Sequence, residues 1–96
     1  TAKAFFGLVR EILEKHAPVE GAMRQIAAEL AGEIDKVIEE HVIVNWKSNI
    51  DVQNRMKNDI EDLLFGFQER AGIALSFEEI DTVLDRCITT AKARAK

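Results

Sequence analysis

Apolar residues recur every three to four positions in four separate segments of this 96-residue chain. This spacing places them on one face of a helix, because an α-helix completes a turn about every 3.6 residues. Helices with one apolar face each bury those faces by packing together. The pattern therefore predicts an all-α fold, a small bundle of about four helices in a single domain, with segments near 3–15, 18–40, 48–72 and 76–91.

Residues that start and stop helices separate these segments. Pro18 is predicted to end the first helix or to open the second, since proline fits a first helical turn but not an interior. Ser48 is predicted to cap the third helix, with Asp51 near its positive end. Gly72 is predicted to stop that helix, because glycine adopts a left-handed turn without strain. The β-branched run at 42–44 fits either the end of the second helix or a short extended link.

The fourth segment has the clearest start signal. Ser76 and Glu79 have the spacing of a capping box, in which each residue's side chain accepts a hydrogen bond from the other's backbone N–H. Leu75 and Ile80 are spaced to form a hydrophobic staple across this box. The basic residues at 92–96 suit the negative end of a helix. The apolar face of this helix is predicted to comprise Phe77, Ile80, Leu84, Cys87, Ile88 and Ala91.

Charge and composition narrow the classes of function. The net charge is −4 and the isoelectric point is near 5.2, whereas an isolated nucleic-acid-binding domain usually carries a basic face. This disfavours nucleic-acid binding without removing it. The single cysteine excludes an intrachain disulfide, and no signal peptide or apolar run of about 20 residues is present, so we expect a cytoplasmic protein with no membrane partner. Thr1 lies inside an apolar pattern, which predicts a C-terminal fragment of a longer subunit.

Motifs for catalysis are missing from the sequence. No lysine follows an acidic residue by two positions, as a common nuclease motif requires, and there is no GxxxxGK[ST] phosphate loop. His16 and His41 lack the spacing of a metal site. Cys87 is interpreted as a core residue, and adjacent carboxylates such as Glu39 and Glu40 as solvated, because neighbours on a helix point in different directions. We therefore predict no enzymatic activity, no cofactor and no metal for this segment itself.

The only tryptophan, Trp46, opens a stretch that mixes charges of both signs. Lys47, Arg55 and Lys57 follow it, but Arg55 and Lys57 each have a carboxylate four residues further on, so ion pairs along the helix are predicted. Three interpretations of Trp46 remain open. The favoured one is an anchor that packs where the second helix meets the third. The others are a contact for a partner protein and a ring that stacks on a nucleic-acid base.

The sequence VNWKSNIDVQNRMKNDIEDLL at 44–64 resembles the C-terminal helical region of the restriction (R, motor) subunit of type I restriction–modification enzymes. The resemblance extends over about 34–67 and loosely beyond. It implies a parent subunit that is an ATP-dependent deoxyribonuclease, assembled with methyltransferase and specificity subunits, with ATP, Mg²⁺ and S-adenosylmethionine bound elsewhere in the complex. None of the nuclease or ATPase motifs lies in this chain, so no catalytic residue is carried over. The matching positions are Val44, Trp46, Asp51, Val52, Met56, Ile60, Asp62 and Leu63.

The resemblance and the missing motifs together predict a non-catalytic assembly module that docks the motor onto the methyltransferase–specificity core, with DNA reached through the complex. The candidate partner contacts or structural anchors are Trp46, Asp51, Arg55 and Lys57. One alternative is an auxiliary DNA-contacting domain, whose candidate weak contacts are Lys47, Lys92, Arg94 and Lys96. Another is a self-associating bundle, such as a homodimer, that covers leftover apolar surface.

Overall fold

A computed structural model describes residues 2–94 and contains four α-helices joined by short links. The described residues form no strand, so the predicted all-α bundle is confirmed. A 3-10 helix precedes the third α-helix and belongs to the link before it. The elements are α1 (Ala2–Leu13), α2 (Ala22–His41), η1 (Trp46–Ser48), α3 (Ile50–Ala71) and α4 (Phe77–Arg94).

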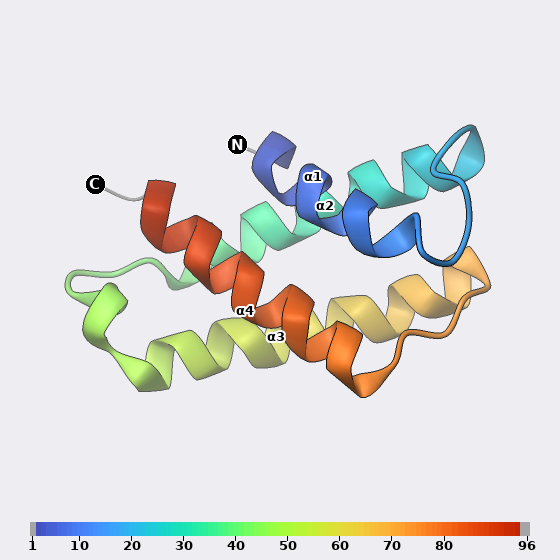
Figure 1. Cartoon of the computed structure of the whole chain (residues 1–96). Helices are drawn as coiled ribbons and strands as arrows, with labels where there is room; N and C mark the ends of the chain where they lie inside the picture. Colours follow the sequence, from blue (N-terminus) through green and yellow to red (C-terminus); the bar gives the residue numbers. More distant parts are fainter. Residues whose placement is uncertain (1, 95–96) are drawn as a thin grey trace.

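Successive helices run in opposite directions along the bundle (Figure 1). α1 packs against α2 and α4, and α3 packs against the same two helices. α2 and α3 contain 20 and 22 residues and are about 30 and 33 Å long, whereas the 12 residues of α1 span about 18 Å. α1 therefore covers only part of its longer neighbours. The link between α2 and α3 lies beyond it, at the left of Figure 1.

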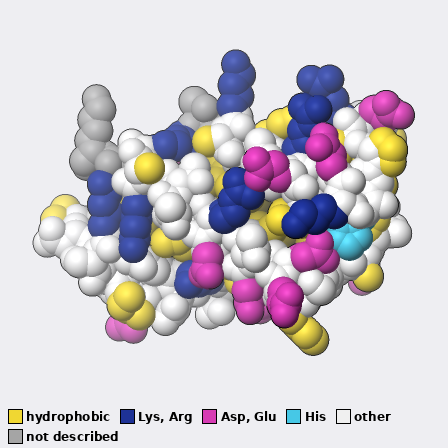
Figure 2. All heavy atoms as spheres, viewed as in Figure 1, with side chains coloured by type: hydrophobic (Ala, Val, Ile, Leu, Met, Phe, Trp, Pro, Cys, Tyr) yellow, Lys and Arg dark blue, Asp and Glu magenta, His cyan; other side chains and the backbone are white. Residues whose placement is uncertain are grey.

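One hydrophobic cluster runs through the bundle and receives side chains from every helix. The predicted apolar faces supply it: Phe5, Leu30, Met56, Ile60 and Cys87 have no solvent-exposed surface. Burying one large apolar side chain contributes about 1.5–3 kcal/mol, so this cluster is the main source of stability. Outside it, charged side chains of both signs are interspersed over the face shown in Figure 2.

The structure corrects the predicted start of α2. Pro18 borders neither helix, since α1 ends at Leu13 and α2 begins at Ala22. Gly21 precedes α2 with a φ of 58°, a left-handed value that a glycine adopts most easily. The carbonyl of Gly21 accepts a hydrogen bond from the backbone N–H of Gln25 (3.3 Å), which closes the first turn. The chain uses the residues between the two helices to reverse its direction.

The N-terminal cap of α3 lies one residue later than predicted. Asn49 Oδ1 accepts a hydrogen bond from the backbone N–H of Val52 at 3.3 Å. The predicted cap, Ser48, belongs to η1, and its hydroxyl donates to the carbonyl of Asn45 at 3.2 Å. Ser48 therefore stabilises the link, while Asn49 satisfies a free donor at the start of the helix.

The C-terminal end of α3 is confirmed, and the structure decides the end of α2, which the sequence leaves open. Gly72 terminates α3 with a φ of 68°, and its N–H donates to the carbonyl of Gln68 at 2.9 Å, as expected of a left-handed glycine stop. α2 ends at His41, and Val42 is extended, with φ −70° and ψ 115°. The β-branched run at 42–44 is therefore a link and not a continuation of α2.

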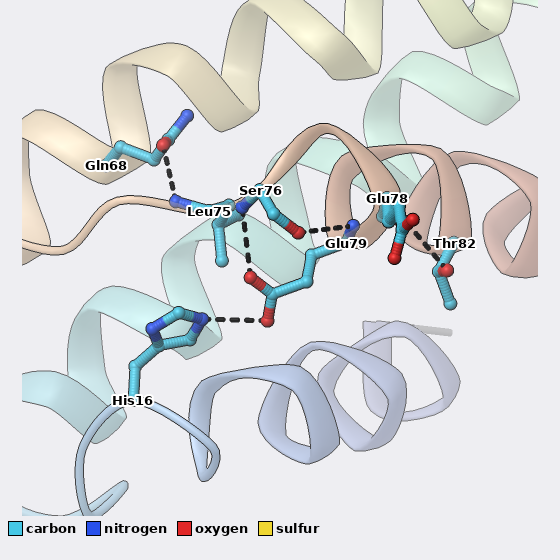
Figure 3. Close-up of polar contacts among 7 residues, drawn as sticks. All are labelled: His16, Gln68, Leu75, Ser76, Glu78, Glu79 and Thr82. Carbon is cyan, nitrogen blue, oxygen red and sulfur yellow. Dashed lines mark hydrogen bonds and ion pairs between the residues drawn. The ribbon is translucent and has the colours of Figure 1, made fainter.

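The predicted capping box of α4 is confirmed (Figure 3). Ser76 Oγ accepts from the N–H of Glu79 at 3.1 Å, and the N–H of Ser76 donates to Glu79 Oε1 at 3.0 Å. The other carboxylate oxygen lies 2.8 Å from Nε2 of His16, so the box also ties α4 to the turn after α1. The Ser76 N–H first, and then His16, hold the pKa of Glu79 below its ordinary value of 4.5. The N–H of Leu75 donates to Gln68 Oε1 at 2.7 Å, which fixes the link into this box.

Phe77 does not lie on the buried face of α4, contrary to the prediction. It is 84% exposed, whereas Ile80 and Leu84 are buried. Val83, which the sequence pattern did not assign to this face, is buried as well. Phe77 is the first residue of α4, and at this end Leu75 from the preceding link packs against the cluster. At this end of α4 the cluster therefore receives Leu75 from the link and not Phe77.

Candidate functional site

The link between α2 and α3 is a short structured loop. After Val42 the chain turns through Asn45, a non-glycine residue with a left-handed φ of 65°. The N–H of Trp46 donates to the carbonyl of Ile43 at 3.2 Å, and the N–H of Ser48 donates to the carbonyl of Asn45 at 3.2 Å. These local hydrogen bonds give the loop a defined shape. They curl it around an open hollow lined by residues 42–48.

Trp46 anchors this loop in the core. Its side chain is 4% exposed and belongs to the hydrophobic cluster. The buried amide of Gln53, in the second turn of α3, donates to the carbonyls of Trp46 (3.2 Å) and Lys47 (2.8 Å). The Trp46 carbonyl also accepts from the backbone N–H of Asn49 at 3.0 Å, so Gln53 is its second donor. The buried amide of Gln53 thereby has two partners, as a buried polar group requires. Burial favours the anchor interpretation of Trp46, and the ring offers almost no surface to a partner or a base.

The residues just before Trp46 are exposed although they are strongly apolar. Val42 is 45% exposed, Ile43 54% and Val44 86%. We call these three residues the link patch. Ile50, the first residue of α3, is 64% exposed at the same end of the bundle. Single exposed apolar residues are common on proteins, but several successive ones mark an interaction surface more often.

A small hollow of about 130 Å³ adjoins the link patch. It lies between the C-terminal ends of α2 and α4. Trp46, Ile38 and Ala91 are buried residues that supply its apolar lining. This volume suits one aliphatic side chain rather than a small-molecule substrate, since ligand pockets usually measure about 300–1,000 Å³. The lining residues are Asp35, Ile38, Glu39, Val42, Trp46, Ala91 and Arg94.

Charged residues of both signs surround the link patch. Glu39 and Glu40 are exposed in the last turn of α2 and form no ion pair or hydrogen bond through their carboxylates with any described residue. Asp51 is exposed in the first turn of α3, where a carboxylate is favourable. His41 does have a partner, since its Nε2 lies 2.6 Å from Asp59 Oδ2 and ties the end of α2 to α3.

Two of the sequence-predicted site residues lie on α3, away from the link patch. Lys57 donates to Asp85 of α4 at 3.1 Å, so its predicted pairing along α3 with Glu61 is wrong. Arg55 is exposed and does not pair with Asp59, which binds His41 instead. These charged side chains pair with residues of neighbouring helices, and the four-residue spacing along α3 contains no information about such partners. The structure does not bring these residues together with Trp46 into one site.

The candidate DNA contacts do not form a free basic patch either. Arg94 donates to Asp35 at 3.4 Å and lies 5.4 Å above the centre of the Phe5 ring. Lys92 is partly buried on α4 and Lys47 is exposed in η1. Lys96 lies outside the described residues. Figure 2 shows Lys and Arg side chains interleaved with Asp and Glu on the face in view.

Cys87, the chain's only cysteine, is buried in the core. Burial raises the pKa of the Cys87 thiol to about 12, because a thiolate is poorly solvated in the core. The described residues include no group of three or more His, Cys, Asp or Glu side chains able to hold a metal ion. None of the described helices is long and apolar enough to cross a membrane.

Sequence reasoning missed Gln53 as the residue that supports the link. A signal was present, because Gln53 lies three residues before Met56 and next to Val52, on the buried side of α3. A polar residue at such a position usually has a specific hydrogen-bonding role. The carbonyls that accept from Gln53 lie in the link before α3. The position of these carbonyls depends on how the link packs on the bundle, so the sequence alone did not identify them.

Comparisons with known proteins leave the family of this chain open. No protein-family model, no curated protein and no solved structure matches it. The fold and the geometry of the link therefore come from this chain alone. The resemblance to type I restriction subunits stays a prediction from the residues at 44–64.

Proposed function

We propose that this chain is a non-catalytic helical assembly module of a type I restriction endonuclease R subunit. It docks the nuclease and translocase parts onto the complex of methyltransferase and specificity subunits. It does so through the exposed end of the bundle between α2 and α3. In this proposal ATP, Mg²⁺ and S-adenosylmethionine act elsewhere in the assembled enzyme, and DNA is reached only through the complex.

The observation that carries this proposal is the link patch. Val44 is 86% exposed, and it also opens the segment at 44–64 whose sequence resembles the R subunit. Contact between apolar side chains and water is unfavourable. Burying this run against a partner therefore stabilises the complex by about 25 cal/mol per Å² of apolar surface. The residues that follow this run are held in place, since Trp46 is buried in the core, its N–H donates to the carbonyl of Ile43, and Gln53 donates to the carbonyls of Trp46 and Lys47. A preordered apolar surface loses little entropy on binding.

Size-exclusion chromatography with a purified cognate methyltransferase–specificity complex tests the proposal, at about 0.15 M salt to screen weak surface charges. We expect the wild-type chain to co-elute with the complex. Val44→Ser is expected to weaken co-elution, because it removes apolar contact area. Phe77→Ser is the matched control, since Phe77 is almost as exposed, 84% against 86% for Val44, but lies in the first turn of α4, at the other end of the bundle from the link patch.

The outcomes separate clearly. Circular dichroism is expected to show the same helix content for both variants, because neither residue is buried. Separate elution of the wild-type chain from the complex would overturn the proposed function. Equal weakening by Val44→Ser and Phe77→Ser would show that general surface apolarity, and not the link patch, drives association.

DNA contact and self-association remain alternative predictions. The paired state of Arg94 and the net charge of −4 give DNA contact little support. Titration of a non-specific duplex at low salt tests it, since phosphate contacts produce affinity that falls steeply as salt rises. Light scattering across a range of protein concentrations tests self-association, which requires the mass to rise with concentration.

A further inference from the structure

Two aromatic side chains are exposed on the outer side of the α3–α4 pair. Phe65 is 48% exposed on α3, and Phe77 is 84% exposed in the first turn of α4. Lys57 of α3 contacts Asp85 of α4 at 3.1 Å, and the two rings lie eight residues further along both antiparallel helices, from 57 to 65 and from 85 to 77. Because both helices have the same rise per residue, Phe65 and Phe77 stand at the same level of the bundle. Aromatic side chains are enriched at protein interfaces.

Each of these rings has a carboxylate one helical turn away. Glu61 and Glu69 lie four residues before and after Phe65, and Asp81 lies four residues after Phe77. Residues four apart lie on the same face of a helix, so these carboxylates flank the rings. None of the three forms an ion pair with any described residue. We call these five residues the acidic aromatic face.

The charges around the acidic aromatic face have one sign. Residues 58–69 and 71–85 contain eight Asp or Glu and no Lys, Arg or His. At the lower edge of Figure 2, Asp and Glu side chains lie beside a protruding hydrophobic side chain. The cations that border these two segments in sequence are engaged with other carboxylates: Lys57 with Asp85, Arg70 with Glu29 and Glu33, and Arg86 with Glu11. The face therefore attracts cations, unlike the mixed charges at the link patch.

The same chain shows how a phenylalanine ring and a carboxylate bind one arginine. Arg94 donates to Asp35 at 3.4 Å, while its guanidinium carbon lies 5.4 Å from the centre of the Phe5 ring. A planar guanidinium stacks on a ring and donates to a carboxylate at the same time, whereas a lysine ammonium is a strongly hydrated point charge. The acidic aromatic face presents the same two groups at two places.

We propose that the acidic aromatic face binds an arginine-rich segment of a partner protein. One guanidinium stacks on Phe65 and pairs with Glu61 or Glu69. A second stacks on Phe77 and pairs with Asp81. This surface lies away from the link patch, so the inference goes beyond the proposed function and does not depend on it.

Other occupants fit this surface less well. Nucleic acids and anionic lipids carry phosphates, which the carboxylates of the acidic aromatic face repel. A second copy of this chain offers few suitable cations, because four of its six arginines, at 10, 70, 86 and 94, pair within its own fold. An arginine-rich segment satisfies both the rings and the carboxylates, and opposite charges also increase its rate of association.

Fluorescence anisotropy with two dye-labelled peptides, hexa-arginine and hexa-lysine, tests this inference at about 0.1 M salt. The peptides have the same charge, so a difference between them reports the guanidinium. We expect the wild-type chain to bind hexa-arginine about fivefold more tightly than hexa-lysine. Phe65→Leu/Phe77→Leu keeps the charge and most of the apolar surface but removes both rings. It is expected to weaken hexa-arginine binding about tenfold and hexa-lysine binding by less than about twofold.

Variants at the link end of the bundle are the matched controls. Val44→Ser removes an exposed apolar side chain there, and we expect it to bind hexa-arginine within about twofold of wild type, because it leaves the rings intact. Glu61→Gln/Asp81→Asn is expected to weaken the binding of both peptides. Glu39→Gln/Glu40→Gln changes the net charge by the same amount and is expected to have a smaller effect, since charges beyond a Debye length are largely screened.

Three results would overturn the inference: no binding of either peptide by the wild-type chain, equal affinity for the two peptides, or unchanged hexa-arginine binding after loss of the rings. Circular dichroism checks that the variants keep their helix content. Phe77→Leu alone serves if the double variant unfolds, because Phe77 is 84% exposed. The experiment does not use the methyltransferase–specificity complex, so failure here leaves the proposed function standing.

Discussion

Gln53 shows how one buried side chain fixes the conformation of a loop. Its amide nitrogen donates to two successive carbonyls, those of Trp46 and Lys47. The Trp46 carbonyl also accepts from the N–H of Asn49 at 3.0 Å, so the Lys47 carbonyl is the one that depends on Gln53. A buried polar group that loses its partner costs about 1–3 kcal/mol. A buried side chain of α3 therefore fixes the backbone that directly follows the link patch.

Replacement of this residue is expected to loosen the loop. Gln53→Ala removes both hydrogen bonds, and we expect it to lower the free energy of unfolding by about 1–3 kcal/mol. Gln25→Ala is the control, because Gln25 is exposed on α2, and it is expected to change stability by less than about 0.5 kcal/mol. Urea denaturation followed by circular dichroism measures both, and equal effects would contradict the role assigned to Gln53.

A second residue-scale prediction concerns pH. The pKa of Glu79 lies below its ordinary value of 4.5 in the folded protein, chiefly because the Ser76 N–H stabilises the carboxylate, with His16 as a further cause. The folded state thus binds this proton less readily than the unfolded state does. The resulting stabilisation is complete above about pH 4.5 and is lost as the pH falls through the lower folded pKa.

Variants of the two neighbouring glutamates isolate this contribution. Glu79→Gln is expected to be less stable than wild type at neutral pH, and the difference is expected to shrink as the pH falls below about 4.5. Glu78→Gln is the control, since no hydrogen bond of the capping box uses its carboxylate. Urea denaturation at several pH values measures the two differences. A Glu79→Gln effect that stays constant into the acid range would contradict the assignment.

At the scale of elements, the apolar spacing and the helix start and stop residues predict most of the helices. The periodic apolar positions and the Ser76–Glu79 box identify α4, and Gly72 identifies the end of α3. Local signals were less reliable where two candidates stand side by side. Ser48 and Asn49 are both good caps. Ser48 belongs to η1, whose first residue Trp46 is buried in the core, so the cap of α3 is Asn49.

The two candidate caps are expected to differ in energy. Asn49→Ala removes the hydrogen bond to the N–H of Val52 and is expected to cost about 1 kcal/mol. Ser48→Ala removes only an exposed hydrogen bond to Asn45, and the expected change is within about 0.5 kcal/mol. Thermal denaturation of both variants measures the difference. A larger loss for Ser48→Ala would restore the sequence-based cap.

At the scale of the whole molecule, the sequence does not predict which side chains pair between helices. Lys57 pairs with Asp85, Arg86 with Glu11, and Arg70 with Glu29 at 3.5 Å. Such exposed pairs contribute only about 0–1 kcal/mol each. They follow from how the helices sit beside one another, and that arrangement depends on packing over the entire core. The predicted pairs along α3 failed for this reason, as did the assignment of Phe77 to the core.

A single core shared by four helices predicts cooperative unfolding. We expect urea transitions followed by circular dichroism and by the fluorescence of Trp46 to have the same midpoint, as in other small domains. Leu30→Ala is expected to shift both midpoints together, with a loss of about 2–5 kcal/mol. A Trp46 transition at lower urea than the loss of helix would show that the link end unfolds separately.

Cys87 gives this cooperativity a chemical consequence. It is the chain's only thiol, it has no exposed surface, and its pKa is raised to about 12. A thiol-reactive dye therefore reaches it only in molecules whose helices have separated, and the modification rate measures how often the core opens. A partner that binds only the folded bundle lowers the population of open molecules by mass action. Slower modification of Cys87 by the dye would thus show that a partner is bound at the surface, although the sulfur does not contact that partner.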